Sequence, residues 1–147
     1  MIALASDHGG FPLKQTIMTH LHSLGLEYQD FGCYDTSRSD YPDYAEPACL
    51  AVTSGKADKA ILFCGTGIGI SIAANKVNGI RASLCTNEYM AKYTRMHNDA
   101  NALCLGARVI GPGVAEDIVD IFLNTDFEGG RHADRIAKIA DIEARQK

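Results

Sequence analysis

The stretch Leu62-Phe63-Cys64-Gly65-Thr66-Gly67-Ile68-Gly69-Ile70-Ser71 decides the fold of this chain. An apolar run from Ala60 to Phe63 predicts a strand, and a run of helical character from Ile70 to Lys76 follows the alternating glycines. We therefore expect a strand, a tight loop and a helix N-terminus. Glycine lets the backbone approach a ligand closely, and the unpaired amides that begin a helix can hold an anion. Cys64 would lie at the mouth of this pocket.

Strand-like and helix-like segments alternate along the rest of the chain. The expected strands are Ile2–Ser6, Glu27–Phe31, Lys59–Phe63, Arg81–Cys85 and Ala102–Leu105. The expected helices begin near Pro12, Ala45, Ile70, Asn87, Pro112 and Arg131, and the last of them directs Ile136, Ile139 and Ala140 inward. This alternation predicts an α/β fold, with a doubly wound five-stranded parallel sheet between two helical layers and a C-terminal helix. Ligands in such folds bind at the carboxyl ends of the strands.

Length and composition limit the possible functions. A chain of 147 residues is long enough for one domain with one core, so we expect a single domain over residues 1–147. A net charge of −4 without a basic stripe argues against nucleic-acid binding. No apolar run approaches the length needed to cross a membrane, and residues 1–6 lack the charged start of a signal peptide.

The cysteines and histidines bear on redox chemistry and metal binding. The cysteines are Cys33, Cys49, Cys64, Cys85 and Cys104. Their odd number and the lack of a C-x-x-C pair argue against a disulfide framework and a thiolate zinc site, and fit a reducing cytoplasm. Only Cys64 lies beside a glycine loop. Three histidines are too scattered along the chain to suggest a metal site: His8, His97 and His132.

The glycine loop has two possible roles. It is not a dinucleotide fingerprint, because Ile70 stands where G-x-G-x-x-G requires glycine, and no Gly-Lys-Ser/Thr sequence is present for a Walker loop. It is either a tight turn with glycines for packing or a cradle for an anion or oxyanion. The pattern favours the cradle. Cys64 is either a core thiol or a general base, since a thiol can act as a base near neutral pH.

Four other groups of residues leave alternatives open. Asp7-His8 ends the first strand and is either a helix cap with a solvent-facing histidine or part of a site. His97-Asn98-Asp99 ends a helix and is either a C-terminal cap or part of a site. Arg131 and Arg135 share one helix face and suit a phosphate, but by spacing alone a solvated face is favoured. Arg108, just after the fifth strand, is similarly ambiguous.

Several motifs in the same order give the chain a resemblance to a known family. They are Ser6-Asp7-His8-Gly9-Gly10, Asp40-Tyr41-Pro42-Asp43-Tyr44-Ala45, Cys64-Gly65-Thr66-Gly67-Ile68-Gly69, Ala73-Ala74-Asn75-Lys76, Gly79-Ile80-Arg81-Ala82, His97-Asn98-Asp99-Ala100-Asn101, Leu105-Gly106-Ala107-Arg108-Val109-Ile110-Gly111 and Glu128-Gly129-Gly130-Arg131-His132. The chain resembles the type B ribose-5-phosphate isomerases, which are grouped with the galactose-6-phosphate isomerase subunits. This resemblance implies a Rossmann-like sheet and a homodimer or homotetramer with active sites between subunits. It also implies aldose–ketose isomerisation of a sugar phosphate without a metal or another cofactor.

The resemblance also implies the roles of individual residues. Cys64 would be the base that moves a proton between C2 and C1, and His97 of the neighbouring subunit would open the furanose ring. Thr66 and the loop amides would stabilise the enediolate; the loop residues are Gly65, Thr66, Gly67, Ile68 and Gly69. The residues that would contact the sugar hydroxyls are Asp7, Tyr41 and Asn98. Those that would bind the phosphate or line its pocket are His8, Arg108, Arg131 and Arg135.

The sequence favours one substrate among several. Some family members use an acidic base after the glycines, but Ile68 to Ser71 offers no carboxylate, so the cysteine form is assigned. The galactose-6-phosphate isomerase subunits lack parts of the set of His8, His97 and two arginines that is complete here, so the resemblance favours D-ribose 5-phosphate and D-ribulose 5-phosphate in the pentose phosphate pathway. The alternatives are an isomerase of allose 6-phosphate or galactose 6-phosphate and a non-catalytic sugar-phosphate-binding module.

Overall fold

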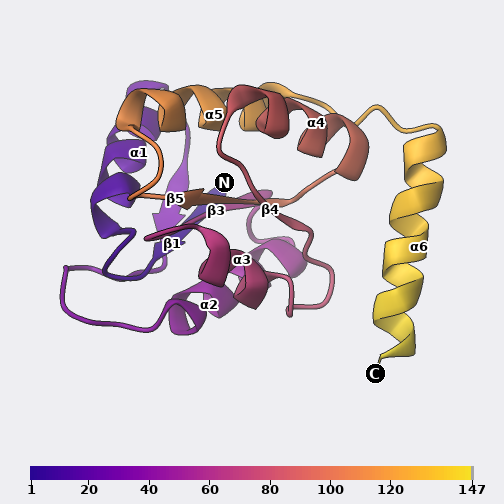
Figure 1. The fold of residues 1–147 in the computed structure, drawn as a ribbon, viewed down its shortest axis with the longest axis horizontal. Helices are drawn as coiled ribbons and strands as arrows, with labels where there is room; N and C mark the ends of the chain where they lie inside the picture. Colours follow the sequence, from indigo (N-terminus) through magenta and orange to yellow (C-terminus); the bar gives the residue numbers. More distant parts are fainter. Residues whose placement is uncertain (147) are drawn as a thin grey trace.

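The computed structural model describes residues 1–146 and contains a five-stranded parallel sheet with helices on both faces (Figure 1). The strands are β1 (Ile2–Ser6), β2 (Tyr28–Asp30), β3 (Lys59–Cys64), β4 (Ala82–Leu84) and β5 (Ala102–Gly106). The helices are α1 (Phe11–Ser23), α2 (Tyr41–Thr53), α3 (Ile68–Ala74), α4 (Glu88–Asn98), α5 (Pro112–Asn124) and α6 (Arg131–Arg145). The predicted fold class is confirmed.

The order of the strands, β2-β1-β3-β5-β4, creates a switch point beside β3. The helix after β1, α1, packs on one face of the sheet, whereas the helix after β3, α3, packs on the other. The carboxyl ends of these neighbouring strands therefore open a crevice, which is where doubly wound sheets bind ligands. The turn after β1 and the glycine loop after β3 border this crevice.

Helices cover both faces of the sheet, and the central strands are mostly apolar. Every residue of β1 and β5 is buried, and the side chains alternate between two cores. Phe63 and Leu105 face the core beneath α1, α4 and α5. Leu62, Cys64 and Cys104 face the core beneath α2 and α3. Cys64 thus continues a buried strand into the crevice.

Some element boundaries differ from those expected. Helix α2 begins at Tyr41 rather than Ala45, because Pro42 occupies its first turn, where proline is well tolerated. Helix α5 packs against the sheet through Ala115, Ile118, Val119 and Phe122, whereas Val114 is 38% exposed. No helix in the described part of the chain is long and apolar enough to cross a membrane.

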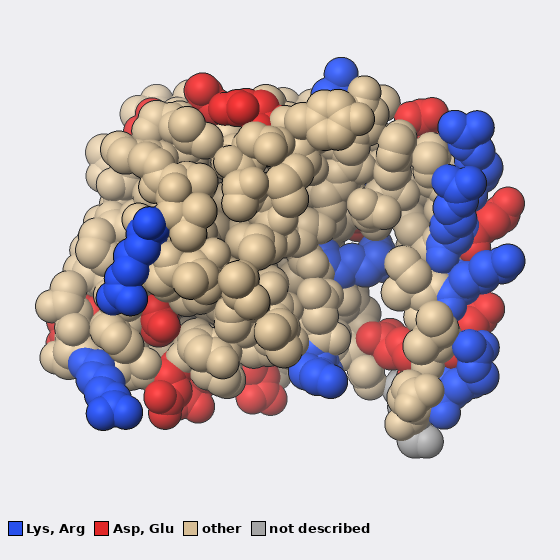
Figure 2. Space-filling view, in the orientation of Figure 1, with Lys and Arg blue, Asp and Glu red and all other residues tan. Residues whose placement is uncertain are grey.

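Helix α6 stands apart from the rest of the molecule (Figure 1). The prediction that Ile139 and Ala140 point inward is wrong, because both are exposed, and Ile142 is 52% exposed. A groove of about 630 Å³ separates the helix from the body, and Figure 2 shows this hollow. Ile139 and Ile142 face this groove opposite Ile80 of the body, and the Gly79 N–H donates to Glu143 at 3.0 Å, but the helix does not pack into the core.

Candidate active site

The crevice at the carboxyl edge gathers residues from three neighbouring strands. Ser6 of β1 pairs with Phe63 of β3, and Cys64 pairs with Gly106 of β5. Asp7, the glycine loop and Arg108 follow these positions directly, so they meet at one edge of the sheet. The backbone N–H of Arg108 donates to the carbonyl of Gly65 at 2.9 Å, which fixes the two loops to each other.

The thiol of Cys64 lies at the base of the glycine loop. The Cys64 side chain is 4% exposed, and the backbone N–H of Gly67 donates to its Sγ at 3.1 Å. Gly67 has φ +79°, and a Cβ there would lie 2.9 Å from the Leu105 carbonyl carbon, so only glycine fits. The Ile68 N–H donates to the Thr66 hydroxyl at 3.1 Å. The loop therefore wraps around the sulfur with its backbone held rigidly.

Asp7 and His8 form the opposite wall of the crevice. The Asp7 carboxylate accepts a hydrogen bond from the Gly10 N–H at 2.9 Å, so this aspartate orders the turn before α1. The His8 backbone N–H donates to the Ser39 hydroxyl at 3.1 Å, and the Ser39 N–H donates to His8 Nδ1 at 3.2 Å. These bonds attach the loop between β2 and α2 to the crevice and orient the imidazole.

A cationic pocket lies beside the glycine loop. His8, Gly9 and Arg108 line a hollow of about 350 Å³ at the start of α1. The Arg108 guanidinium passes so close to Gly65 that a Cβ on this glycine would lie 3.0 Å from Nη1. A charged guanidinium and a nearby imidazole suit an anionic group such as phosphate.

Tyr41 covers the other end of the glycine loop. Its ring lies against Gly69, where a Cβ would come within 2.8 Å of the ring. The side chain is 37% exposed, and it borders a hollow of about 440 Å³ with Lys76. The Tyr41 ring can lie against the loop because Gly69 has no side chain.

The remaining candidate residues lie at the other edge of the sheet. His97 and Asn98 end α4, which leads into the amino end of β5, whereas Cys64 pairs with the last residue of that strand. Arg131 and Arg135 are exposed on α6, and the loop before α6 is joined to α4 by a hydrogen bond from the Glu128 N–H to the Met96 carbonyl. Within one chain, these four residues do not meet Cys64.

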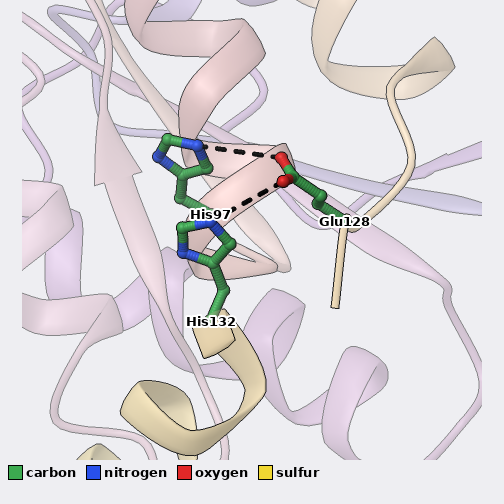
Figure 3. Close-up of side chains that lie close together, drawn as sticks. All are labelled: His97, Glu128 and His132. Carbon is green, nitrogen blue, oxygen red and sulfur yellow. Dashed lines mark ion pairs between the residues drawn. The ribbon is translucent and has the colours of Figure 1, made fainter. Parts of the chain in front are cut away.

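His97 belongs to a cluster that the sequence did not reveal. Its ring stacks on that of His132 with centroids 4.1 Å apart and an angle of 13° between the planes (Figure 3). Glu128 faces both rings, at 3.9 Å from His97 Nε2 and 4.0 Å from His132 Nε2. The prediction that the histidines are scattered is therefore wrong for this pair. The i, i+4 spacing of Glu128 and His132 was the available signal.

The environment of His132 favours its neutral form. Burial lowers the pKa of this imidazole, and the neighbouring His97 lowers that pKa further, although Glu128 opposes both effects. The side chain is 4% exposed, and its Nε2 has no hydrogen-bond partner among the described residues.

Chemically, the carboxyl edge combines three functions. Cys64 supplies a group that can exchange a proton, the loop supplies N–H donors beside it, and Arg108 with His8 supplies a site for an anion. An anionic substrate held by the cationic pocket could present neighbouring carbon atoms to the sulfur. Such a set suits proton transfer next to a carbonyl, where negative charge develops on oxygen.

Comparisons with known proteins agree with this arrangement. The model of the family described as Ribose/Galactose Isomerase matches residues 2–139. The chain is 50% identical to ribose-5-phosphate isomerase B of Escherichia coli (strain K12), with 99% of this chain and 97% of that protein covered. It is 43% identical to D-erythrulose-4-phosphate isomerase of Pectobacterium atrosepticum, with 99% and 97% covered.

Solved structures show the same fold at high similarity. Ribose-5-phosphate isomerase B of Clostridium thermocellum superimposes with a TM-score of 0.98 at 53% identity, and 99% of each chain is covered. The enzyme of Mycoplasma genitalium with bound ribulose-5-phosphate superimposes with a TM-score of 0.92 at 43% identity, with 97% of this chain and 95% of that chain covered. The chain described here belongs to the ribose/galactose isomerase family.

Proposed function

We propose that this protein interconverts D-ribose 5-phosphate and D-ribulose 5-phosphate. The observation that carries the proposal is the Cys64 thiol, held in a glycine loop next to the cationic pocket of His8 and Arg108. The relatives named ribose-5-phosphate isomerase B support this substrate, as does the related structure with bound ribulose-5-phosphate. The phosphate would anchor the sugar and present its first two carbons to Cys64.

The proposed reaction moves one proton between two carbons. After ring opening, Cys64 takes the proton from C2 of the aldose, the electron pair of the broken C2–H bond forms the C1–C2 double bond, and the C1 carbonyl oxygen takes up the negative charge of the enediolate. A proton then passes from the C2 hydroxyl to the C1 oxygen, which leaves the charge on the C2 oxygen. Return of the proton to C1 gives the ketose. Thr66 and the loop amides stabilise the charged oxygen, and one such donor contributes about 3–4 kcal/mol in other enzymes. Asp7 and Tyr41 contact the sugar hydroxyls.

We propose that a second copy of the chain completes the site. His97 would open the sugar ring, Asn98 would contact a hydroxyl, and Arg131 and Arg135 would bind the phosphate, all from the partner subunit. β5 has five residues and spans roughly 16 Å at ~3.3 Å per residue, which separates the two edges of one sheet. The exposed apolar stripe of α6 offers a surface for that partner, in a dimer or a tetramer.

A coupled assay with ribose 5-phosphate, run with and without a chelator, tests this function. The proposal expects turnover in both conditions, because the groups that move protons belong to the chain itself. A panel should include four-carbon and six-carbon sugar phosphates, since one relative is named for D-erythrulose 4-phosphate. A faster reaction with allose 6-phosphate or galactose 6-phosphate would overturn the assignment of the substrate.

The Cys64→Ala variant separates catalysis from binding. It should lose at least about 10²-fold in turnover, the usual contribution of a positioned acid–base group, while it still binds ribulose 5-phosphate. Exchange of the C2 proton with solvent, followed by nuclear magnetic resonance, measures the step directly. Exchange at the wild-type rate would contradict the role of Cys64, and binding without exchange in the wild type would indicate a sugar-phosphate sensor.

All five cysteines are free, which supports a cytoplasmic location.

A further inference from the structure

The cluster of His97, Glu128 and His132 has the donor set of a transition-metal site. One nitrogen of each imidazole and one carboxylate oxygen lie within 4.8 Å of one another (Figure 3). Two histidines and one glutamate can hold a zinc ion and leave a fourth position open to water. We propose that these three side chains bind a divalent transition-metal ion such as Zn²⁺, and that the bound ion removes His97 from catalysis.

The first support is the unsatisfied polar group at the centre of the cluster. The Nε2 atom of His132 is buried and has no hydrogen-bond partner in the described part of the chain. An unmade hydrogen bond of this kind costs roughly 1–3 kcal/mol. Glu128 Oε1 lies 4.0 Å from this nitrogen, which is too far to form a hydrogen bond. A metal ion between the two would satisfy both groups.

The second support is the spacing of the donor atoms. With metal–ligand bonds of about 2.1 Å, donors in a tetrahedral zinc site lie about 3.4 Å apart. Glu128 Oε2 is 3.9 Å from His97 Nε2, and its other oxygen, Oε1, is 4.0 Å from His132 Nε2. Closing the site requires each of these separations to shrink by about half an ångström. The two rings are stacked at an angle of 13°, so one imidazole must also turn out of the stack before both Nε2 lone pairs can point at the same ion.

The third support is that backbone contacts hold the three residues together. The N–H of Glu128 donates to the Met96 carbonyl at 3.0 Å, directly before His97, and the N–H of His132 donates to the Gly129 carbonyl at 3.2 Å. The donors therefore come from the end of α4, the loop before α6 and the first turn of α6. Preorganisation of this kind lowers the entropy cost of binding an ion.

Occupancy of this site would inhibit the proposed isomerase. A metal ion on His97 Nε2 uses the lone pair that would otherwise accept or deliver a proton during ring opening. This consequence rests on the proposed role of His97, whereas the binding of the ion does not. The ion is therefore an inhibitor in this scheme and takes no part in the proton transfer at Cys64.

Calorimetric titration of the chelator-treated protein with ZnCl₂ tests the site itself. We expect one ion per chain, and a loss of affinity of more than about tenfold in Glu128→Gln and in His132→Gln, since even partners of metal ligands contribute 10–100-fold. His22→Gln, an exposed histidine on α1, is the matched control and should bind like the wild type. Cys64→Ala should also retain the ion. Unchanged affinity in Glu128→Gln, or loss of binding in Cys64→Ala, would overturn the proposal.

The isomerase assay tests the inhibition separately. Zn²⁺ should slow the conversion of ribose 5-phosphate by the wild type, and a chelator should restore the rate. Glu128→Gln should require a more than tenfold higher concentration of Zn²⁺ for the same inhibition. If the ion binds but the wild-type rate is unchanged, the inhibitory role is wrong and the site stands. If isomerisation occurs only with the ion, the inhibitory role is wrong; if it occurs neither with nor without the ion, the proposed function fails, and the calorimetric result still decides the site.

Discussion

At the scale of single residues, the glycine loop depends on positions that accept no side chain. A Gly67→Ala change places a Cβ 3.0 Å from the Gly106 nitrogen and 2.9 Å from the Leu105 carbonyl carbon, in a backbone with φ +79°. We expect a loss of about 1–3 kcal/mol of stability from this strain, together with a loss of turnover as the loop leaves Cys64. Gly113→Ala on α5, where a Cβ meets nothing within 4 Å, is the control. Urea denaturation and the coupled assay measure both effects, and a fully active Gly67→Ala would contradict this account of the loop.

Buried thiols should make the folded protein less stable as the pH rises above 9. Burial raises the pKa of Cys49 and of Cys85 from 9.0 to about 12. Between pH 9 and pH 12 these thiols lose their protons in the unfolded chain but keep them in the folded chain. Their contribution to the free energy of unfolding is therefore complete below pH 9 and decreases as the pH rises toward 12. Each thiol can contribute a slope of at most about 1.4 kcal/mol per pH unit. Urea denaturation at several values from pH 8 to pH 11 should show a shallower decline in Cys49→Ala, and an equal decline would argue against this linkage.

At the scale of elements, α6 is expected to bind the phosphate through its first two turns. Arg131→Ala and Arg135→Ala should each raise the KM for ribose 5-phosphate by about tenfold or more, because a hydrogen bond to a charged group contributes roughly 1.5–3 kcal/mol. Turnover at saturating substrate should change less. Arg145→Ala, exposed at the other end of the same helix, is the matched control. Steady-state kinetics measure the effect, and an unchanged KM in both variants would place the phosphate elsewhere.

The elements also show which features the sequence could predict. The buried strands β1, β3 and β5 were predicted because they are continuous apolar runs bounded by turns. The sequence predicts the start of α2 too late, because the polar residues around Tyr41 are typical of a loop, whereas in the structure Pro42 lies in the first turn of the helix. The stripe on α6 was identified from its spacing, but spacing does not reveal whether the surface that covers it belongs to the same chain.

At the scale of the whole molecule, the candidate residues divide between two edges of the sheet. The sequence placed Asp7, Cys64 and Arg108 together because parallel strands end at one edge, and the structure brings these residues together. It did not predict the stack of His97 on His132, because the two residues meet only through the loop between α5 and α6. Tertiary contacts of this kind carry no local pattern in the sequence.

This division makes a prediction about mixed dimers. Cys64→Ala and His97→Asn homodimers should both convert ribose 5-phosphate poorly. In a mixed dimer with one site on each side of a two-fold axis, one site combines the intact Cys64 of one chain with the intact His97 of the other. Random assembly of equal amounts should then restore about a quarter of the wild-type sites. Coexpression of the two variants followed by the coupled assay measures this recovery, with each variant expressed alone as the control. No recovery in verified mixed dimers would mean that Cys64 and His97 do not share a site across subunits, since complementation requires that each chain supply what the other lacks.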